Sequence, residues 1–143
     1  MAKYRPILSS LYKLLGKGIT DANQLLTVGK RLLGPKFLGA FPQDRAPRDL
    51  RKGDMFLLNT DKAGKSGTHW VAIYYAQPKF IIYDSYGRNS TRLLPHFVKS
   101  IGYKFADTDP DAEQSRAAKD CGQRSIGFLL LLKRHGIATA MKL

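Results

Sequence analysis

Hydrophobic residues recur every three to four positions over the first quarter of the chain, which is the spacing of amphipathic helices. The pattern predicts one helix over residues 4 to 15, followed by glycines at positions 16 and 18. A second helix should begin at Thr20 or Asp21 as N-cap and end at Gly34-Pro35. Because lysine and arginine occupy the other faces, we expect residues 1 to 31 to form a basic amphipathic arm that packs on a sheet.

The hydrophobic period changes further along the chain. Residues 39 to 54 hold two prolines and two glycines without periodicity, so we expect an irregular connection there. Runs at 55–59, 69–75 and 80–84 are rich in aromatic and branched residues and predict three antiparallel strands. A short helix capped by Ser90 should run through Val98, and residues 103–106 should form a fourth strand.

A run of apolar residues, Ile126 to Leu132, lies inside a predicted helix from Cys121 to His135. A helix that is apolar all round is a buried one. We therefore expect a single α+β domain over residues 1–143, in which a small antiparallel-type sheet packs against this central helix. The run is too short to cross a bilayer, so we expect no transmembrane helix, and we favour no membrane as a partner.

The charge of the protein is strongly positive, with 24 Lys and Arg against 11 Asp and Glu and a net charge of +13. Such a surface favours polyanions and predicts salt-sensitive, non-specific nucleic-acid binding. A basic surface that only confers solubility, or an arm that lies on a membrane surface, remains open. The N-terminus lacks the apolar core of a secretory signal, and one cysteine forms no internal disulfide. Both features predict a location inside the cell.

Cys121 is the only cysteine, and it stands where the last helix should begin. The N–H groups and dipole of a helix N-terminus favour a thiolate over a thiol, so Cys121 is a candidate nucleophile. The alternative interpretation is that it is a small buried hydrophobic residue.

Two further residues could complete a hydrolytic site. His69 begins one predicted strand and Asp84 ends the next, so pairing through a turn near Gln77-Pro78 would place them opposite each other. A histidine base oriented by a carboxylate is what a cysteine nucleophile requires. One cysteine and three scattered histidines lack the spacing of a zinc site, so we expect no metal.

The order of these residues resembles the cysteine proteases of the adenain family, the adenovirus maturation proteases, and the related SUMO-specific proteases. His69-Trp70 comes first, then Asp84 in Tyr-Asp-Ser-Tyr-Gly, then Gln114, and seven residues later Asp120-Cys121-Gly122. Similar segments upstream, at 37–41 and 58–60, extend the likeness to roughly residues 32 to 135.

The resemblance implies a role for each matching residue. Cys121 would be the nucleophile, His69 the general base and acid, and Asp84 the residue that orients the imidazole. Gln114 and the backbone N–H of Cys121 would form the oxyanion hole, and Trp70 and Gly122 would line the substrate cleft. The chain departs from adenain in ending soon after the predicted cysteine helix and in lacking a second cysteine for a disulfide-linked activating peptide.

The function that follows is a monomeric cysteine endopeptidase that cleaves at glycine-containing sites and processes viral capsid or core precursors. It would need no cofactor, although DNA could act as an activating polyanion inside the virion or host cell. One alternative is a protease that removes ubiquitin or SUMO. Another, from a different class, is a non-enzymatic basic DNA-binding virion protein.

Overall fold

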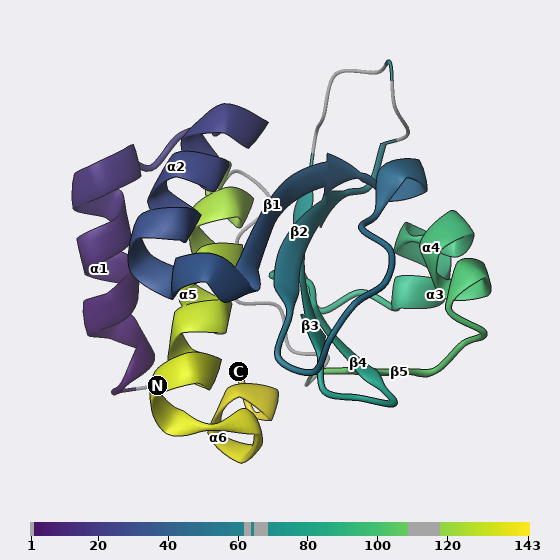
Figure 1. The fold of residues 1–143 in the computed structure, drawn as a ribbon. Coiled ribbons are helices and arrows are strands. Elements are labelled where there is room, and N and C mark those ends of the chain that lie inside the picture. Colours follow the sequence, from purple (N-terminus) through teal and green to yellow (C-terminus); the bar gives the residue numbers. More distant parts are fainter. Residues whose placement is uncertain (1, 62–63, 65–68, 109–117) are drawn as a thin grey trace.

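The computed structural model describes residues 2–61, 64, 69–108 and 118–143. Its elements form a mixed α/β fold in three layers, with a sheet between two layers of helices (Figure 1). The helices are α1 (Tyr4–Leu15), α2 (Ala22–Leu33), α3 (Ser90–Leu93), α4 (Pro95–Ser100), α5 (Cys121–His135) and α6 (Ile137–Met141). The strands are β1 (Phe37–Pro42), β2 (Met55–Asn59), β3 (Trp70–Tyr75), β4 (Phe80–Tyr83) and β5 (Phe105–Asp107).

The five strands lie in the sheet in their order along the chain, β1-β2-β3-β4-β5. The central three pair antiparallel, which confirms the predicted meander. The sheet is mixed rather than antiparallel throughout, because β1 runs parallel to β2 and β5 runs parallel to β4. The sequence could not show this, since the partner and direction of an edge strand depend on contacts far away in the chain.

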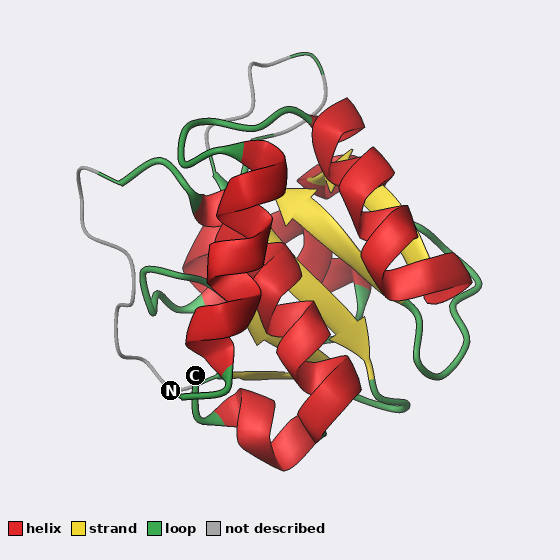
Figure 2. Ribbon diagram, turned by 90° about the vertical axis from the view of Figure 1, so that its left-hand side faces the viewer, coloured by secondary structure: helices red, strands yellow, loops and turns green. Residues whose placement is uncertain are grey.

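The central helix α5 has the predicted bounds and is buried along most of its length. It packs on the sheet at β3 and β2 and also contacts α1 and α2, and the three helices lie on one side of the sheet (Figure 2). Phe128 stacks on Tyr83 of β4 with ring centroids 4.7 Å apart, which fixes the helix to the sheet. Within the described ranges, no helix is long and apolar enough to cross a membrane.

The two N-terminal helices follow their predicted pattern. Leu11 of α1 and Leu25 of α2 are completely buried. Asp21 is the N-cap of α2. Its side chain accepts a hydrogen bond from the backbone N–H of Gln24, and the Gln24 side chain accepts one from the backbone N–H of Asp21. The expected packing of the whole arm on the sheet is wrong for α1, which packs mainly on α5, whereas α2 packs on the sheet at β1.

Two local predictions are also wrong. Residues 37–42 form the edge strand β1, which overlaps the start of the segment expected to be irregular. The strand was not predicted because Gly39, with φ 132°, interrupts its alternation, and its register with β2 shifts between Phe37 and Ala40. The helix expected from Ser90 to Val98 is two short helices that break at Leu94, since a residue before proline disfavours helical geometry. Asn89, rather than Ser90, caps the first of them.

Candidate functional site

The edge of the sheet where β3 begins and β4 ends holds a buried, hydrogen-bonded pair of a histidine and a carboxylate. His69 directly precedes β3 and Asp84 directly follows β4, and the His69 Nε2 atom hydrogen-bonds Asp84 Oδ1. Only 7% of His69 and 4% of Asp84 are exposed. The sequence prediction that these residues meet is confirmed.

The predicted register between these strands is wrong by two residues. Ala72 lies opposite Tyr83, so the same register continued past the strand ends sets Tyr86, rather than Asp84, opposite His69. The rings of Tyr86 and His69 are indeed in contact, with centroids 5.1 Å apart. Because side chains alternate with a period of two, the shift keeps Asp84 on the same face, and it reaches His69 as a diagonal neighbour.

Arg88 completes the surroundings of the carboxylate, and the sequence analysis did not identify it. Its Nε atom lies 3.0 Å and its backbone nitrogen 2.9 Å from Asp84 Oδ2, so both carboxylate oxygens have partners. Burial raises the pKa of Asp84, but hydrogen bonds from His69 and Arg88 outweigh it, and the pKa lies below its ordinary value. The spacing of four residues between Asp84 and Arg88 within a turn was the available signal.

Cys121 is the first residue of α5 and is 7% exposed. Its sulfur accepts a hydrogen bond from the backbone N–H of Trp70, with N and Sγ 3.4 Å apart. Burial lowers the pKa of His69, but the hydrogen bond with Asp84 and the nearby thiol of Cys121 have the larger combined effect and raise it. The structure therefore brings Cys121, His69 and Asp84 together from three separate elements.

The connection between α1 and α2 anchors the N-terminal end of α5. The Gln123 side chain donates to the carbonyl oxygens of Gly16 and Gly18, at 2.9 and 3.0 Å. The Trp70 indole donates to the carbonyl oxygen of Thr20 at 3.1 Å. These contacts join residues about 50 to 107 positions apart, so no local sequence signal predicted them.

Trp70 and Gly122, expected to line a substrate cleft, both pack against this connection. Trp70 is 8% exposed and belongs to the core beside α5. A Cβ atom on Gly122 would lie 2.2 Å from Thr20 Oγ1 and 2.9 Å from Leu25 Cδ2. The close approach of Thr20, and of Leu25 in α2, explains the glycine, and a role of Trp70 or Gly122 in substrate binding stays a prediction.

Replacing Gly122 with alanine is expected to destabilise the protein by about 1–3 kcal/mol, because the new methyl group overpacks the contact with Thr20 and Leu25. Gly18→Ala is the matched control, since a Cβ there would meet nothing within 4 Å. Urea unfolding of both variants measures the difference. Equal free energies of unfolding for the two would contradict this explanation of Gly122.

The His69–Asp84 pair makes stability depend on pH. The raised pKa of His69 stabilises the fold below its ordinary value of 6.5, and this contribution is lost as pH rises through the folded pKa. The lowered pKa of Asp84 stabilises the fold above its ordinary value of 3.8, and this contribution is lost as pH falls through the folded pKa. Both contributions are therefore complete between those two ordinary values.

We accordingly expect Asp84→Asn to lower the free energy of unfolding more at about pH 5.5 than at a pH above the folded pKa of His69, where the native histidine has lost its charge. Urea titrations of the native protein and the variant at the two pH values measure this. A loss of the same size at both would show that the pair is not charged in the folded protein.

Gln114, the remaining predicted site residue, lies outside the described residues, and its part in an oxyanion hole stays a prediction. Among the residues that the structure describes, no three histidine, cysteine or acidic side chains are grouped so that they could hold a metal ion.

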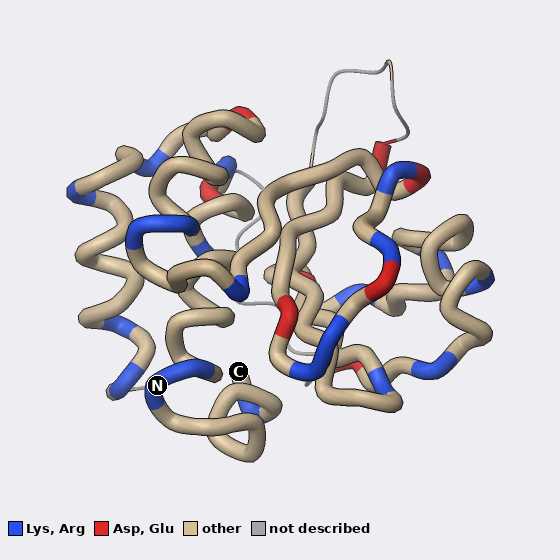
Figure 3. The backbone as a smooth tube through the Cα atoms, viewed as in Figure 1, with Lys and Arg blue, Asp and Glu red and all other residues tan. Residues whose placement is uncertain are grey.

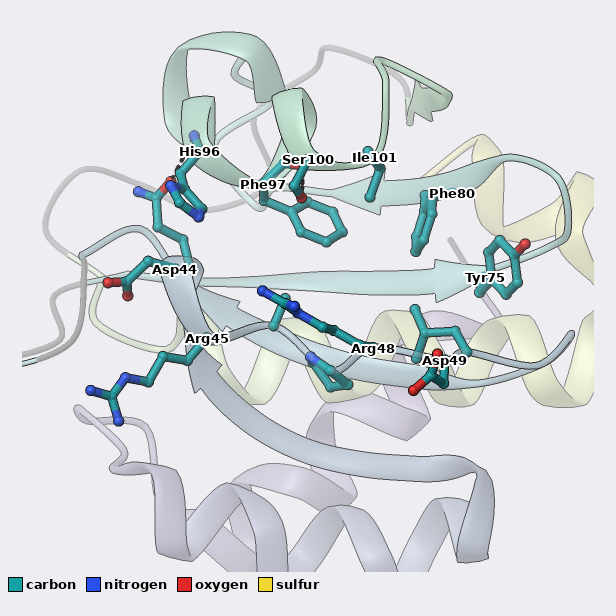
Figure 4. A pocket seen from close by; sticks show the side chains of 14 residues that line it. Asp44, Arg45, Arg48, Asp49, Tyr75, Phe80, His96, Phe97, Ser100 and Ile101 are labelled. Atoms are coloured by element: carbon teal, nitrogen blue, oxygen red, sulfur yellow. Dashed lines mark hydrogen bonds between the residues drawn. The ribbon is translucent and has the colours of Figure 1, made fainter.

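Basic residues occur in most parts of the described chain (Figure 3). Lysine and arginine lie along α1, α2 and the connection between β1 and β2 (Figure 3). A separate hollow of about 650 Å³ lies on the face of the sheet opposite α5. Phe80, Phe97 and His96 line one side of it, and the segment 43–50, with Arg48 and Asp49, lines the other (Figure 4). Cys121 and His69 are not among its lining residues, so the hollow is separate from the candidate site.

No protein-family model matches the chain, and no curated protein matches it significantly. The geometry of Cys121, His69 and Asp84 is therefore the ground on which a function can be argued.

Proposed function

We propose that this protein is a cysteine endopeptidase in which Cys121 is the nucleophile. The observation that carries the proposal is the meeting of three groups: a thiol at the start of a buried helix, a histidine beside it, and a buried carboxylate bonded to that histidine. A nucleophile, a base and a group that orients the base are what thiol hydrolysis needs. A core cysteine requires neither a neighbouring histidine nor its carboxylate.

The reaction follows from the chemistry of these groups. His69 takes the thiol proton, and the Cys121 sulfur attacks the scissile carbonyl carbon to form a tetrahedral oxyanion. The backbone N–H of Cys121, with Gln114 as implied by the family resemblance, would stabilise that oxyanion. His69 then protonates the leaving amine, and the C–N bond breaks to leave a thioester. Water, activated by His69, hydrolyses the thioester and regenerates the thiol.

Asp84 would keep the imidazole in the productive orientation during both proton transfers. It bonds Nε2, which leaves Nδ1 as the ring nitrogen available to the thiol. Arg88 holds the second carboxylate oxygen, so rotation of the carboxylate would break a bond on each side. The raised pKa of His69 favours the imidazolium that forms when the thiol gives up its proton.

The substrate class comes from the resemblance to the adenain family: protein sites with glycine next to the cleaved bond, in viral capsid or core precursors. A protease for ubiquitin-like modifiers is the alternative within the same chemistry, since those modifiers end in Gly-Gly. Rates of hydrolysis of a fluorogenic modifier and of a precursor peptide would separate the two. Preference for the intact modifier would favour the alternative.

The net charge of +13 supports association with DNA, which would hold a small protease near its substrates within a particle. For non-specific binding through phosphate contacts, the logarithm of the association constant should fall linearly with the logarithm of the salt concentration. Fluorescence anisotropy with duplexes of unrelated sequence measures this. Affinity that does not change with salt, or that depends strongly on sequence, would contradict the electrostatic interpretation.

Alkylation by iodoacetamide separates the enzyme from a non-enzymatic basic virion protein. In the proposed protease the native thiol reacts faster than free cysteine at neutral pH, because His69 can accept its proton during the attack on the reagent. His69→Gln should slow the reaction. A native thiol that reacts no faster than free cysteine, and is unaffected by His69→Gln, would support the non-enzymatic alternative.

A further inference from the structure

Asp120, the residue before Cys121, has an unusual conformation for its position. Aspartate is among the residues that most often cap a helix N-terminus with their side chains, and a capping residue has extended backbone angles. Asp120 instead has φ −102° and ψ 26°, a sparsely populated region in which many active-site residues are found. Of the described N–H groups in the first turn of α5, none is capped by the Asp120 carboxylate.

Two side chains hold this carboxylate away from the helix N-terminus. The Tyr12 hydroxyl of α1 donates a hydrogen bond to Asp120 Oδ2, and Arg124 Nε lies 3.0 Å from the same oxygen. Asp120 is only 4% exposed. Its other oxygen, Oδ1, is buried and accepts no hydrogen bond from any residue that the structure describes.

A buried carboxylate with one oxygen unsatisfied gains by turning toward free N–H groups. The nearest helix N-terminus offers such groups, together with a favourable dipole. If the carboxylate capped α5, the peptide between Asp120 and Cys121 would rotate toward the extended conformation. The Cys121 N–H would then point elsewhere, and a negative charge would stand at the place where the oxyanion develops.

We propose that Tyr12 is a positioning residue that keeps the Asp120 carboxylate off the N-terminus of α5 and thereby fixes the orientation of the Cys121 N–H. The effect on catalysis rests on the proposed protease function; the effect on helix capping does not. The N-terminal helix α1 thus acts on the site through a single hydroxyl group.

The Tyr12 phenol can serve in this way at any pH used for assay. Burial and the hydrogen bond to Asp120 raise the pKa of Tyr12 to about 12, so the hydroxyl keeps its proton and remains a donor. The kinetic effect of losing it should therefore be the same across the pH profile.

Tyr12→Phe tests the proposal, with Tyr4→Phe as the matched control. Tyr4 also lies on α1, and its hydroxyl donates to the backbone carbonyl of Arg124, 3.3 Å away. We expect Tyr12→Phe to lower kcat for peptide hydrolysis about tenfold with little change in KM, which is less than the loss of a whole oxyanion donor causes. Tyr4→Phe should leave kcat within about twofold of the native value. Adding Tyr12→Phe to Asp120→Ala should cause no further loss, because alanine has no side-chain oxygen that could cap α5.

Amide hydrogen exchange of Gly122 and Gln123 provides a measurement that does not need activity. In Tyr12→Phe these amides should exchange more slowly than in the native protein, since the released carboxylate caps them, whereas Tyr4→Phe should leave them unchanged. Unchanged exchange in Tyr12→Phe, or equal loss of kcat in both variants, would overturn the proposal. If the native protein hydrolyses no peptide, the protease function fails, and the exchange result alone decides the role of Tyr12.

Discussion

Replacing His69 with glutamine is expected to lower kcat for peptide hydrolysis by about three orders of magnitude. Glutamine can still bond to Asp84, but it cannot accept the thiol proton or return a proton to the leaving amine. Because the substitution leaves substrate binding untouched, KM should change little. Initial rates on a peptide with glycine at the cleaved bond, measured over a range of concentrations, separate the two constants.

His96→Gln is the control for this prediction. His96 lies on α4 and lines the hollow on the other face of the sheet. Its backbone N–H donates to Gln43 Oε1 at 3.3 Å, and this hydrogen bond does not involve the imidazole. The His96 variant should retain the native kcat. A similar loss in the two variants would mean that His69 acts through the fold and not through proton transfer.

Asp84→Ala is expected to have the largest effect on stability, about 3 kcal/mol or more. The substitution leaves His69 buried without its partner and removes the acceptor of two hydrogen bonds from Arg88. The side chain of Asp84 is 1% exposed, so little solvent screens the pair. Activity should fall as well, because the imidazole loses the group that orients it.

Asp54→Ala provides the comparison, and urea unfolding at one pH measures both variants. Asp54 pairs at 3.4 Å with Lys36, whose side chain is 50% exposed, and accepts from the Arg51 N–H at 2.8 Å. Its loss should cost about 1 kcal/mol. If Asp84→Ala cost no more than Asp54→Ala, the His69–Asp84 pair would not be the structural centre of the site.

The sequence predicted those parts of the fold that local signals determine. The bounds of α5 follow from the apolar run Ile126 to Leu132 and from Gly136 as its C-cap, and those of α2 from Asp21 and Gly34. The edge strand β1 was missed because Gly39 and Pro42 interrupt its pattern, although its pairing with β2 tolerates both. Edge strands owe their place to a partner strand, which a local pattern does not reveal.

In the candidate site, too, the contacts that depend on local signals were predicted and those that depend on distant packing were not. His69, Asp84 and Cys121 could be predicted to meet, because each stands at the end of a recognisable element. The register was wrong by two residues, since the turn between β3 and β4 decides it and the strand pattern alone does not. The contact of Tyr12 with Asp120 spans 108 positions, so it depends on how α1 packs against α5.

The most direct test of the central claim is hydrolysis of a Leu-X-Gly-Gly peptide by the native protein and by Cys121→Ala, each with and without DNA. The protease account predicts cleavage after glycine by the native protein, a rate that DNA leaves unchanged or increases, and no cleavage by Cys121→Ala. Cleavage that persists in Cys121→Ala, or its absence from the native protein under both conditions, would contradict the account.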